Sequence, residues 1–258
     1  MRIRRILAPN PGPYTGPGTN TYLVGDDAGL AVIDPGPIEA SHEAAIVEAI
    51  GEQRVTAVVV THTHVDHAPL ANPLARILGV PAMGYDAGPE FDPDVRLSNG
   101  AVAPAGSLRL EAVHTPGHAQ DHLCLQVGEV MFTGDHIMGG SSVVVQDLSA
   151  YMASLERLQH MKLTRLYPGH GPEMDQPQEV ISWYLAHRRQ RQEEILAAVS
   201  AGAGTIGAVV EVVYAEVDEK LHPIAATSVA AHLEKLRREG QVTLAGTDWD
   251  SAVEPTGV

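Results

Sequence analysis

The chain has little cysteine, few large aromatic residues and few basic residues. It contains one Cys, two Phe and two Trp among 258 residues, and 17 Lys and Arg stand against 32 Asp and Glu, giving a formal net charge of −15. One cysteine cannot form an internal disulfide, which favours a reducing compartment, the cytoplasm. The acidic excess disfavours non-specific binding to nucleic acid or anionic lipid, because neutralising phosphate needs Lys and Arg.

Long apolar runs are missing as well. No stretch approaches the about 20 residues of a membrane span, and no apolar segment follows the basic N-terminus, so we expect no membrane association. The core must be built mainly from Val, Leu, Ile and Ala. Cys124 lies in the apolar run 123–127 and is interpreted as a small buried side chain rather than a nucleophile.

The most informative segment directly follows a short β-branched run. Residues 55–60 read Val-Thr-Ala-Val-Val-Val, which predicts a buried strand, and residues 61–67 read Thr-His-Thr-His-Val-Asp-His. Alternate side chains of an extended chain point the same way, so His62 and His64 should share one side. Beyond the turn, Asp66 and His67 can reach a second centre. Imidazole and carboxylate are ligands of zinc, with manganese and iron as alternatives.

Three later segments each place one more candidate ligand after a glycine near a strand end. His118 follows Thr-Pro-Gly, Asp135 follows Phe-Thr-Gly, and His170 follows Tyr-Pro-Gly. These positions allow the side chains to converge at one rim of the sheets. Together with the first segment, they predict a site for two divalent metal ions per chain, with zinc as the first choice.

The pattern along the chain predicts two unequal parts. Up to residue 180, strands and helices alternate without a strict βαβ rhythm, which favours two sheets with helices outside. A long helix over 178–199, three helical pieces and a terminal β-hairpin then follow, which is the pattern of a winged helix. We therefore expect a metal-binding catalytic domain at 1–180 and a winged-helix-like domain at 181–258. The three helical pieces are predicted at 205–214, 221–225 and 228–239.

The seven candidate ligands resemble the metal-binding set of the metallo-β-lactamase superfamily. The resemblance implies an α/β (α+β) fold, a four-layer αββα sandwich with the metals at one edge between its sheets. It also implies the ligands of each ion: His62, His64 and His118 for the first, Asp66, His67 and His170 for the second, and Asp135 bridging the two.

Residues around these ligands carry further expectations. Asp34, in Ile-Asp-Pro-Gly, matches the superfamily's buried aspartate, and His122 and His136 are expected beside it behind the ligands, where they fix ligand orientation. For His122, a structural hydrogen bond and an acid role toward the substrate are equal alternatives. Asn20 and Tyr22, in a loop rich in Gly and Pro, are candidates for substrate binding, with turn formation as the preferred alternative. The segment 188–191, Arg-Arg-Gln-Arg, is interpreted as a solvated helix face rather than an RNA contact.

Residues 18–22, 118–122 and 167–172, together with the C-terminal part, are similar to the β-lactamase-like protein 2 family. Members combine the metal domain with a winged-helix-like tail, and the animal members are known as mitochondrial endoribonucleases acting on single-stranded RNA. The resemblance implies a dinuclear hydrolase in which a metal-bridging hydroxide attacks a phosphodiester, with Asp66 orienting the hydroxide. The chain departs from the animal proteins at residues 114 and 136, which are His where Tyr and Cys are expected.

Other functions stay open. A thioesterase of the glyoxalase II type, acting on a small acyl thioester, shares the metal motif and accords with the acidic charge. Flavodiiron redox proteins carry a carboxylate at the position of His64, and β-lactamases carry Cys or Ser at that of Asp135, so both are disfavoured. A nucleic-acid-binding regulator needs a basic footprint, whereas the tail is acidic. Duplex DNA is therefore disfavoured, and we expect the tail to act as a lid, a homodimer contact or a substrate-shaping element.

Overall fold

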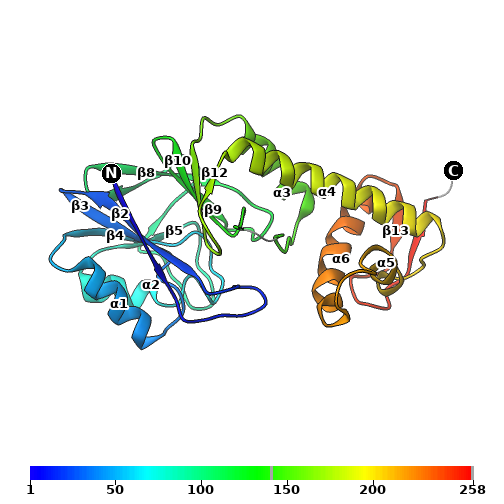
Figure 1. Cartoon of the computed structure of the whole chain (residues 1–258), viewed down its shortest axis with the longest axis horizontal. Helices are drawn as coiled ribbons and strands as arrows, with labels where there is room; N and C mark the ends of the chain where they lie inside the picture. The colour runs from blue at the N-terminus through cyan, green and yellow to red at the C-terminus, as the bar shows by residue number, and fades with distance from the viewer. Residues whose placement is uncertain (140–141, 257–258) are drawn as a thin grey trace.

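The computed structural model describes residues 1–139 and 142–256, which form a larger and a smaller part joined by one long helix (Figure 1). Two six-stranded sheets make up the larger part. The first contains, in spatial order, β1 (Arg2–Leu7), β2 (Asn20–Asp26), β3 (Gly29–Ile33), β4 (Val55–Val59), β5 (Ala82–Gly84) and β6 (Val95–Arg96). The second contains, in spatial order, β12 (Met174–Asp175), β11 (Arg165–Pro168), β10 (Val130–Gly134), β9 (Leu123–Val127), β8 (Leu108–His114) and β7 (Val102–Ala105).

Both sheets mix antiparallel and parallel pairs. In the first sheet, β1, β2 and β3 pair antiparallel, and β3 to β6 pair parallel. In the second, only β10 and β11 are parallel. Parallel neighbours end at the same edge of a sheet. The β3–β4 pair therefore brings Asp34 beside Thr61, and the β10–β11 pair brings Asp135 beside His170.

Helices cover the outer face of each sheet. They are α1 (Ala40–Ile50) and α2 (Ala71–Leu78) on the first sheet, and α3 (Leu148–Gln159) and the first half of α4 (Pro177–Ser200) on the second. The strands alternate between the two surroundings. In β4 and the residue after it, Ala57 and Val59 pack between the sheets, whereas Val58 and Val60 pack toward α1 and α2. The predicted four-layer αββα sandwich is confirmed.

The smaller part has its own hydrophobic core. Its elements are the second half of α4, α5 (Ile206–Val213), the 3-10 helix η1 (Glu219–Leu221), α6 (His222–Arg238), β13 (Val242–Leu244) and β14 (Val253–Pro255). The prediction of two helical pieces at 221–225 and 228–239 was wrong, because α6 is continuous across both. No Gly or Pro interrupts its interior, and Pro223 lies in the first turn, where a helix tolerates it.

Helix α4 packs against both parts. Ile181 and Leu185 belong to the core that α3 covers, whereas Ile195 and Val199 belong to the core of the smaller part. The predicted boundary between residues 180 and 181 falls within the first two turns of this helix. The division into 1–180 and 181–258 therefore stays a prediction.

The structure also bears on the expectations for Cys124 and for a membrane-spanning helix. Cys124 is buried in β9, and burial raises the pKa of its thiol to about 12, which keeps it protonated and unreactive at neutral pH. Across residues 1–139 and 142–256, no helix has both the length and the apolar character needed to cross a membrane.

Candidate metal centre

The seven predicted ligands meet at one edge of the sandwich, where strands of both sheets end. The segment 60–67 follows β4, and His118 lies in the turn between β8 and β9. Asp135 directly follows β10, and His170 lies two residues beyond β11. The structure gathers the seven side chains into two groups that share Asp135. The groups are His62, His64, His118 and Asp135, and Asp66, His67, Asp135 and His170.

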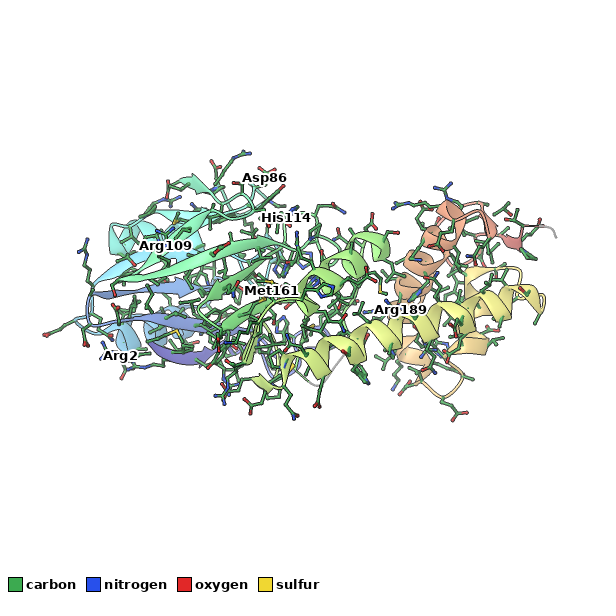
Figure 2. The ribbon with its side chains drawn as sticks, turned by 90° about the horizontal axis from the view of Figure 1, so that it is seen from above. Arg2, Asp86, Arg109, His114, Met161 and Arg189 are labelled. Atoms are coloured by element: carbon green, nitrogen blue, oxygen red, sulfur yellow. The ribbon has the colours of Figure 1, made fainter. Side chains whose placement is uncertain are left out.

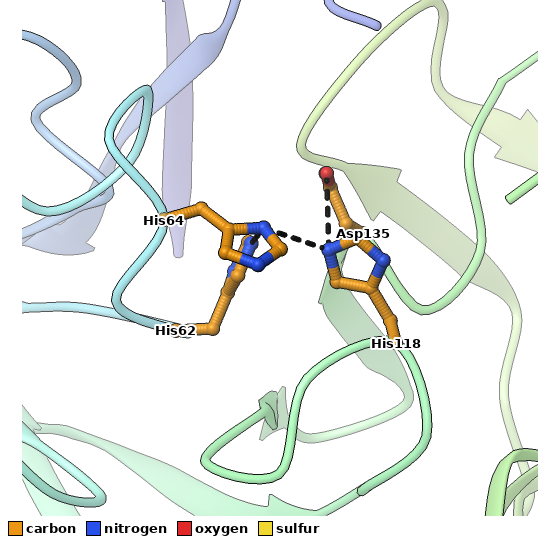
Figure 3. Close-up of side chains that lie close together, drawn as sticks. All are labelled: His62, His64, His118 and Asp135. Carbon is orange, nitrogen blue, oxygen red and sulfur yellow. Dashed lines mark hydrogen bonds and ion pairs between the residues drawn. The ribbon is translucent and has the colours of Figure 1, made fainter. Parts of the chain in front are cut away.

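In the first group, three imidazoles and a carboxylate point toward one another (Figure 3). Nδ1 of His64 lies 2.9 Å from Nε2 of His62 and 3.0 Å from Nε2 of His118. Oδ2 of Asp135 lies 3.6 Å from Nε2 of His118. Three imidazole nitrogens and one carboxylate oxygen form a donor set that zinc accepts.

In the second group, two imidazoles lie between two carboxylates. Nε2 of His170 lies 3.1 Å from Oδ2 of Asp66 and 3.3 Å from Nε2 of His67. Oδ1 of Asp135 lies 3.4 Å from Nε2 of both histidines. Asp135 thus offers one oxygen to each group, which is the arrangement that a bridging ligand requires.

Four of the histidines are oriented by an acceptor on their outer side. In each, Nδ1–H donates to a hydroxyl, carboxylate or carbonyl oxygen, so that Nε2 faces inward. The pairs are His62 with Thr61 (3.0 Å), His67 with Asp34 (2.9 Å), His118 with Val144 (2.7 Å) and His170 with Gly18 (3.1 Å). A carbonyl oxygen can only accept, so Nδ1 of His118 and of His170 carries the proton. This tautomer is the one that binds a metal through Nε2.

The charges of the second group call for a cation between the carboxylates. Burial alone would raise the pKa of the Asp135 carboxyl, but the imidazoles of His67 and His170 lower it well below its usual range. Burial alone would lower the pKa of His170, but the carboxylates of Asp135 and Asp66 beside its Nε2 raise it to about 9. Two ionised carboxylates at a buried site therefore need positive charge beside them, and a divalent ion supplies more of it than a proton does.

The residues present fit a pair of divalent ions. Within the described residues, Oδ1 of Asp135 is buried and makes no hydrogen bond, although Nε2 of His67 and Nε2 of His170 each lie 3.4 Å from it. Such an atom costs free energy unless a ligand or an ion pairs with it. Zinc, manganese and iron all accept imidazole and carboxylate, so this donor set suits metal binding without selecting one element.

Asp34 lies behind the second group, as expected. Its backbone φ is 47°, a left-handed conformation that Asp and Asn adopt more readily than most residues. Oδ1 accepts from the backbone N–H of Thr61 at 2.7 Å, and Oδ2 accepts from the Thr61 hydroxyl at 2.7 Å and from Nδ1 of His67 at 2.9 Å. Asp34 therefore joins the start of the metal loop to one of its ligands.

His122 and His136 lie behind Asp135 and differ in their contacts. Nε2 of His122 accepts from the backbone N–H of Asp135 at 3.1 Å, and its Nδ1 donates to the hydroxyl of Thr115 at 2.8 Å. Both nitrogens of this fully buried ring are thus engaged, which selects the structural alternative over an acid role. His136 makes no side-chain hydrogen bond within the described residues and packs on Tyr151. Burial lowers its pKa to about 3, so the ring is neutral.

Asn20 and Tyr22, the candidates for substrate binding, are both buried. Nδ2 of Asn20 donates to the carbonyls of Pro168 and Gly171, each at 2.9 Å. The Tyr22 hydroxyl also donates to Pro168, at 2.8 Å, and its ring packs between the sheets. Neither side chain offers a polar group at the surface. The structure therefore corrects the expected substrate contact to a support for the loop that carries His170.

The supporting roles of two residues, Asp121 and Gly169, were not predicted from the sequence. Oδ2 of Asp121 accepts from the backbone N–H of Thr63, between two ligands, at 2.9 Å. Gly169 is also needed, since a Cβ there would lie 2.5 Å from Oδ1 of Asp135. Asp121 lies three residues after His118 in the sequence, but nothing in that spacing indicates that it reaches across to Thr63. For Gly169, its place directly before a ligand was the available signal.

The centre is accessible on the side of the 62–67 loop. His64 and Asp66 are partly exposed, and the Asp66 side chain retains 20% of its accessible surface. Val65, between them, is 69% exposed. The other five ligands are buried. The accessible side of the centre is therefore the one formed by His64, Val65 and Asp66.

Comparisons with known proteins identify both parts. A family profile described as "Metallo-beta-lactamase superfamily" matches residues 14–88 and 81–170, and one described as "Beta-lactamase associated winged helix domain" matches residues 205–249. The Beta-lactamase-like protein 2 homolog of Drosophila melanogaster is 35% identical, over 93% of this chain and 89% of its own length. The Atrochrysone carboxyl ACP thioesterase of Aspergillus fumigatus is 34% identical, over 77% of this chain and 65% of its own length.

A solved structure supports the whole arrangement of the fold. A metallo-beta-lactamase family protein from Thermus thermophilus superposes with a TM-score of 0.80 at 20% identity, and the match covers 98% of each chain. At this identity the likeness establishes the fold, the smaller C-terminal part included. The match of residues 205–249 to the winged helix profile confirms the expected winged-helix relationship of that part.

Proposed function

Because this chain belongs to the metallo-β-lactamase superfamily, a family of hydrolases, we propose that it uses two divalent metal ions to hydrolyse a phosphodiester, with single-stranded RNA as the substrate class. The carrying observation is the pair of four-residue groups that share Asp135. The first would hold one ion through His62, His64 and His118. The second would hold the other through Asp66, His67 and His170, with Asp135 between them. Zinc is the first choice.

The chain's own residues set the orientation and access that hydrolysis needs. When bound, such a pair of ions lowers the pKa of a shared water and stabilises charge that develops on the substrate oxygen. Asp66 lies at the accessible side, where its carboxylate can accept a hydrogen bond from the attacking water and orient it. Asp34 and His122 hold His67 and Asp135 in place from behind.

The phosphodiester proposal draws its support from the extent of the relationship. The Drosophila relative matches across both parts of this chain, and single-stranded RNA is the substrate class that the resemblance to its family implies. The C-terminal part would then shape the approach to the centre rather than read duplex DNA, in keeping with the net charge of −15.

A thioester is the second candidate, favoured by a specific observation. A relative that is 34% identical is named as a thioesterase of an acyl carrier protein. The same centre can act on a thioester, because attack on a carbonyl carbon also builds charge on an oxygen. The acidic surface opposes RNA more than it opposes a small acyl thioester.

One panel of assays separates these candidates. Purified protein with measured metal content would be tested on a single-stranded RNA oligonucleotide, on bis-p-nitrophenyl phosphate and on glutathione and pantetheine thioesters. We expect metal-dependent cleavage of the phosphodiesters. Turnover confined to the thioesters would replace the phosphodiester proposal with the second candidate.

Matched variants test the metal dependence itself. His62→Ala and Asp66→Ala remove one ligand from each group and should abolish turnover and lower metal content. His160→Ala, an exposed histidine outside the centre, is the control and should leave both unchanged. Full turnover by His62→Ala and Asp66→Ala would overturn the proposed function.

A further inference from the structure

The turn that carries His118 is hydrogen-bonded to a neighbouring segment, residues 143–147. The carbonyl of Val144 accepts from Nδ1 of His118 at 2.7 Å. The carbonyl of Gly117 accepts from the backbone N–H groups of Gln146 and Asp147, at 2.8 and 3.0 Å. Three hydrogen bonds therefore make the position of this ligand depend on segment 143–147.

Segment 143–147 is held in turn by α4 and α6. The guanidinium of Arg188, on α4, donates to the carbonyl of Val143 and lies over the ring of Tyr151, 5.3 Å from its centroid. Arg238, near the end of α6, forms an ion pair of 3.0 Å with Asp147. The interpretation of residues 188–191 as a solvated helix face is therefore wrong for Arg188, which is only 2% exposed.

Arg188 is a buried cation that has no carboxylate partner among the described residues. In the described ranges, Arg189 and Arg191 pair with carboxylates but Arg188 forms no ion pair, and its Nε is buried without a hydrogen-bond partner, although buried charges are normally paired. A methionine of similar length would fill the same space without the cost of desolvating a cation. Packing alone therefore does not account for an arginine here, whereas its hydrogen bond to the segment behind His118 does.

We propose that Arg188, on the helix that joins the two parts, is a positioning residue for the first metal group and fixes the ligand His118. The path has two steps. Arg188 fixes the carbonyl of Val143, and the adjacent carbonyl of Val144 fixes the tautomer and direction of the His118 ring. The second group is not on this path, because His67 and His170 are oriented by Asp34 and Gly18.

The inference rests on the proposed function, and metal titration tests both separately. Zinc would be titrated into the metal-free full-length protein against a chromophoric chelator, with His118→Ala identifying the binding step of the first group. In Arg188→Met, we expect that step to weaken about 10-fold, the lower end of the effect of losing a direct outer partner of a ligand, because Arg188 acts through the segment and not on His118 itself. The other step and the melting temperature should change little. Arg189→Met is the matched control, since Arg189 lies next on the same helix with its side chain 60% exposed (Figure 2).

Each outcome decides between the alternatives. Two unchanged binding steps in Arg188→Met would overturn the inference and leave the proposed function intact. Equal weakening of both steps with a lower melting temperature would also overturn it, because that is the signature of a residue that only joins the two parts. A wild-type protein that binds no zinc, manganese or iron would refute the proposed function and this inference with it.

Discussion

Replacement of Asp34 by Asn tests whether a buried carboxylate organises the metal loop. Asn also tolerates the left-handed φ of 47°, so the backbone should not change. If the amide oxygen keeps the bond to the backbone of Thr61, the NH2 group faces the Thr61 hydroxyl and Nδ1–H of His67. The hydroxyl can rotate to accept, but Nδ1–H of His67 then meets a donor.

The expected magnitude follows from these contacts. Hydrogen bonds to a charged group contribute about 1.5–3 kcal/mol each, and an unpaired buried donor costs about 1–3 kcal/mol. With one bond kept and one replaced, we expect the free energy of unfolding of the metal-free protein to fall by about 2–4 kcal/mol. His67 can avoid the contact between two donors by moving its proton from Nδ1 to Nε2. In that tautomer Nε2 is not free to bind a metal, and the second group should bind zinc about 10–100-fold more weakly.

Urea unfolding followed by circular dichroism, together with competitive zinc titration, measures both effects. Asp27→Asn is the control, because Asp27 pairs with Arg2 at the surface with its side chain 96% exposed, and exposed pairs contribute little. Asp34→Asn with the stability and zinc affinity of the wild type would refute the reasoning.

Three further predictions follow from the same structure. Gly169→Ala should lower zinc binding at both groups, because a Cβ would lie 2.5 Å from Oδ1 of the shared Asp135; metal analysis and a melting curve check this. Burial alone would raise the pKa of Asp147, but the N–H of Ala150 and the guanidinium of Arg238 lower it. The ionised Asp147 carboxylate therefore stabilises the folded protein above about pH 4, and this contribution is lost as pH falls through the pKa of Asp147 in the folded protein. Asp147→Asn should therefore be less stable than the wild type in urea unfolding at pH 7, and the difference should shrink toward pH 3. Chelation of the metals should abolish turnover and lower the melting temperature, and zinc at about 100 times its Kd should restore about 2.7 kcal/mol per site.

The ligand positions could be predicted from the sequence because metal binding demands particular side chains. Histidine is scarce enough that four segments in order, three of them with a glycine directly before a His or Asp, indicate a centre. The backbone groups that accept hydrogen bonds from the ligand histidines could not be predicted in the same way. Val144 and Gly18 act through backbone carbonyls, which every residue carries, so no sequence pattern marks them.

The sequence also did not reveal which polar side chains are buried. Tyr22 and Arg188 both carry polar groups and lie in or beside polar segments, yet tertiary packing buries them. Whether Tyr22 faces solvent depends on the loop at Pro168, far away in the chain. The sandwich itself was predictable, because its strands are short apolar runs and its helices show a repeating apolar face. The break predicted inside α6 failed because short helical runs without a Gly or Pro between them join readily.

The clamp between residues 18–22 and 168–171 has a consequence for the order of synthesis. Asn20 and Tyr22 bind carbonyls almost 150 positions later, and β1 pairs with the strand that carries them. A ribosome adds about 5–20 residues per second, so the histidines of the first loop wait many seconds for their partners. During that time a nascent chain holds the metal-binding side chains of residues 62–67 without Asp135 and His170, which complete the second group. The final assembly of the centre is therefore a late, long-range step of folding, completed only after His170 has emerged.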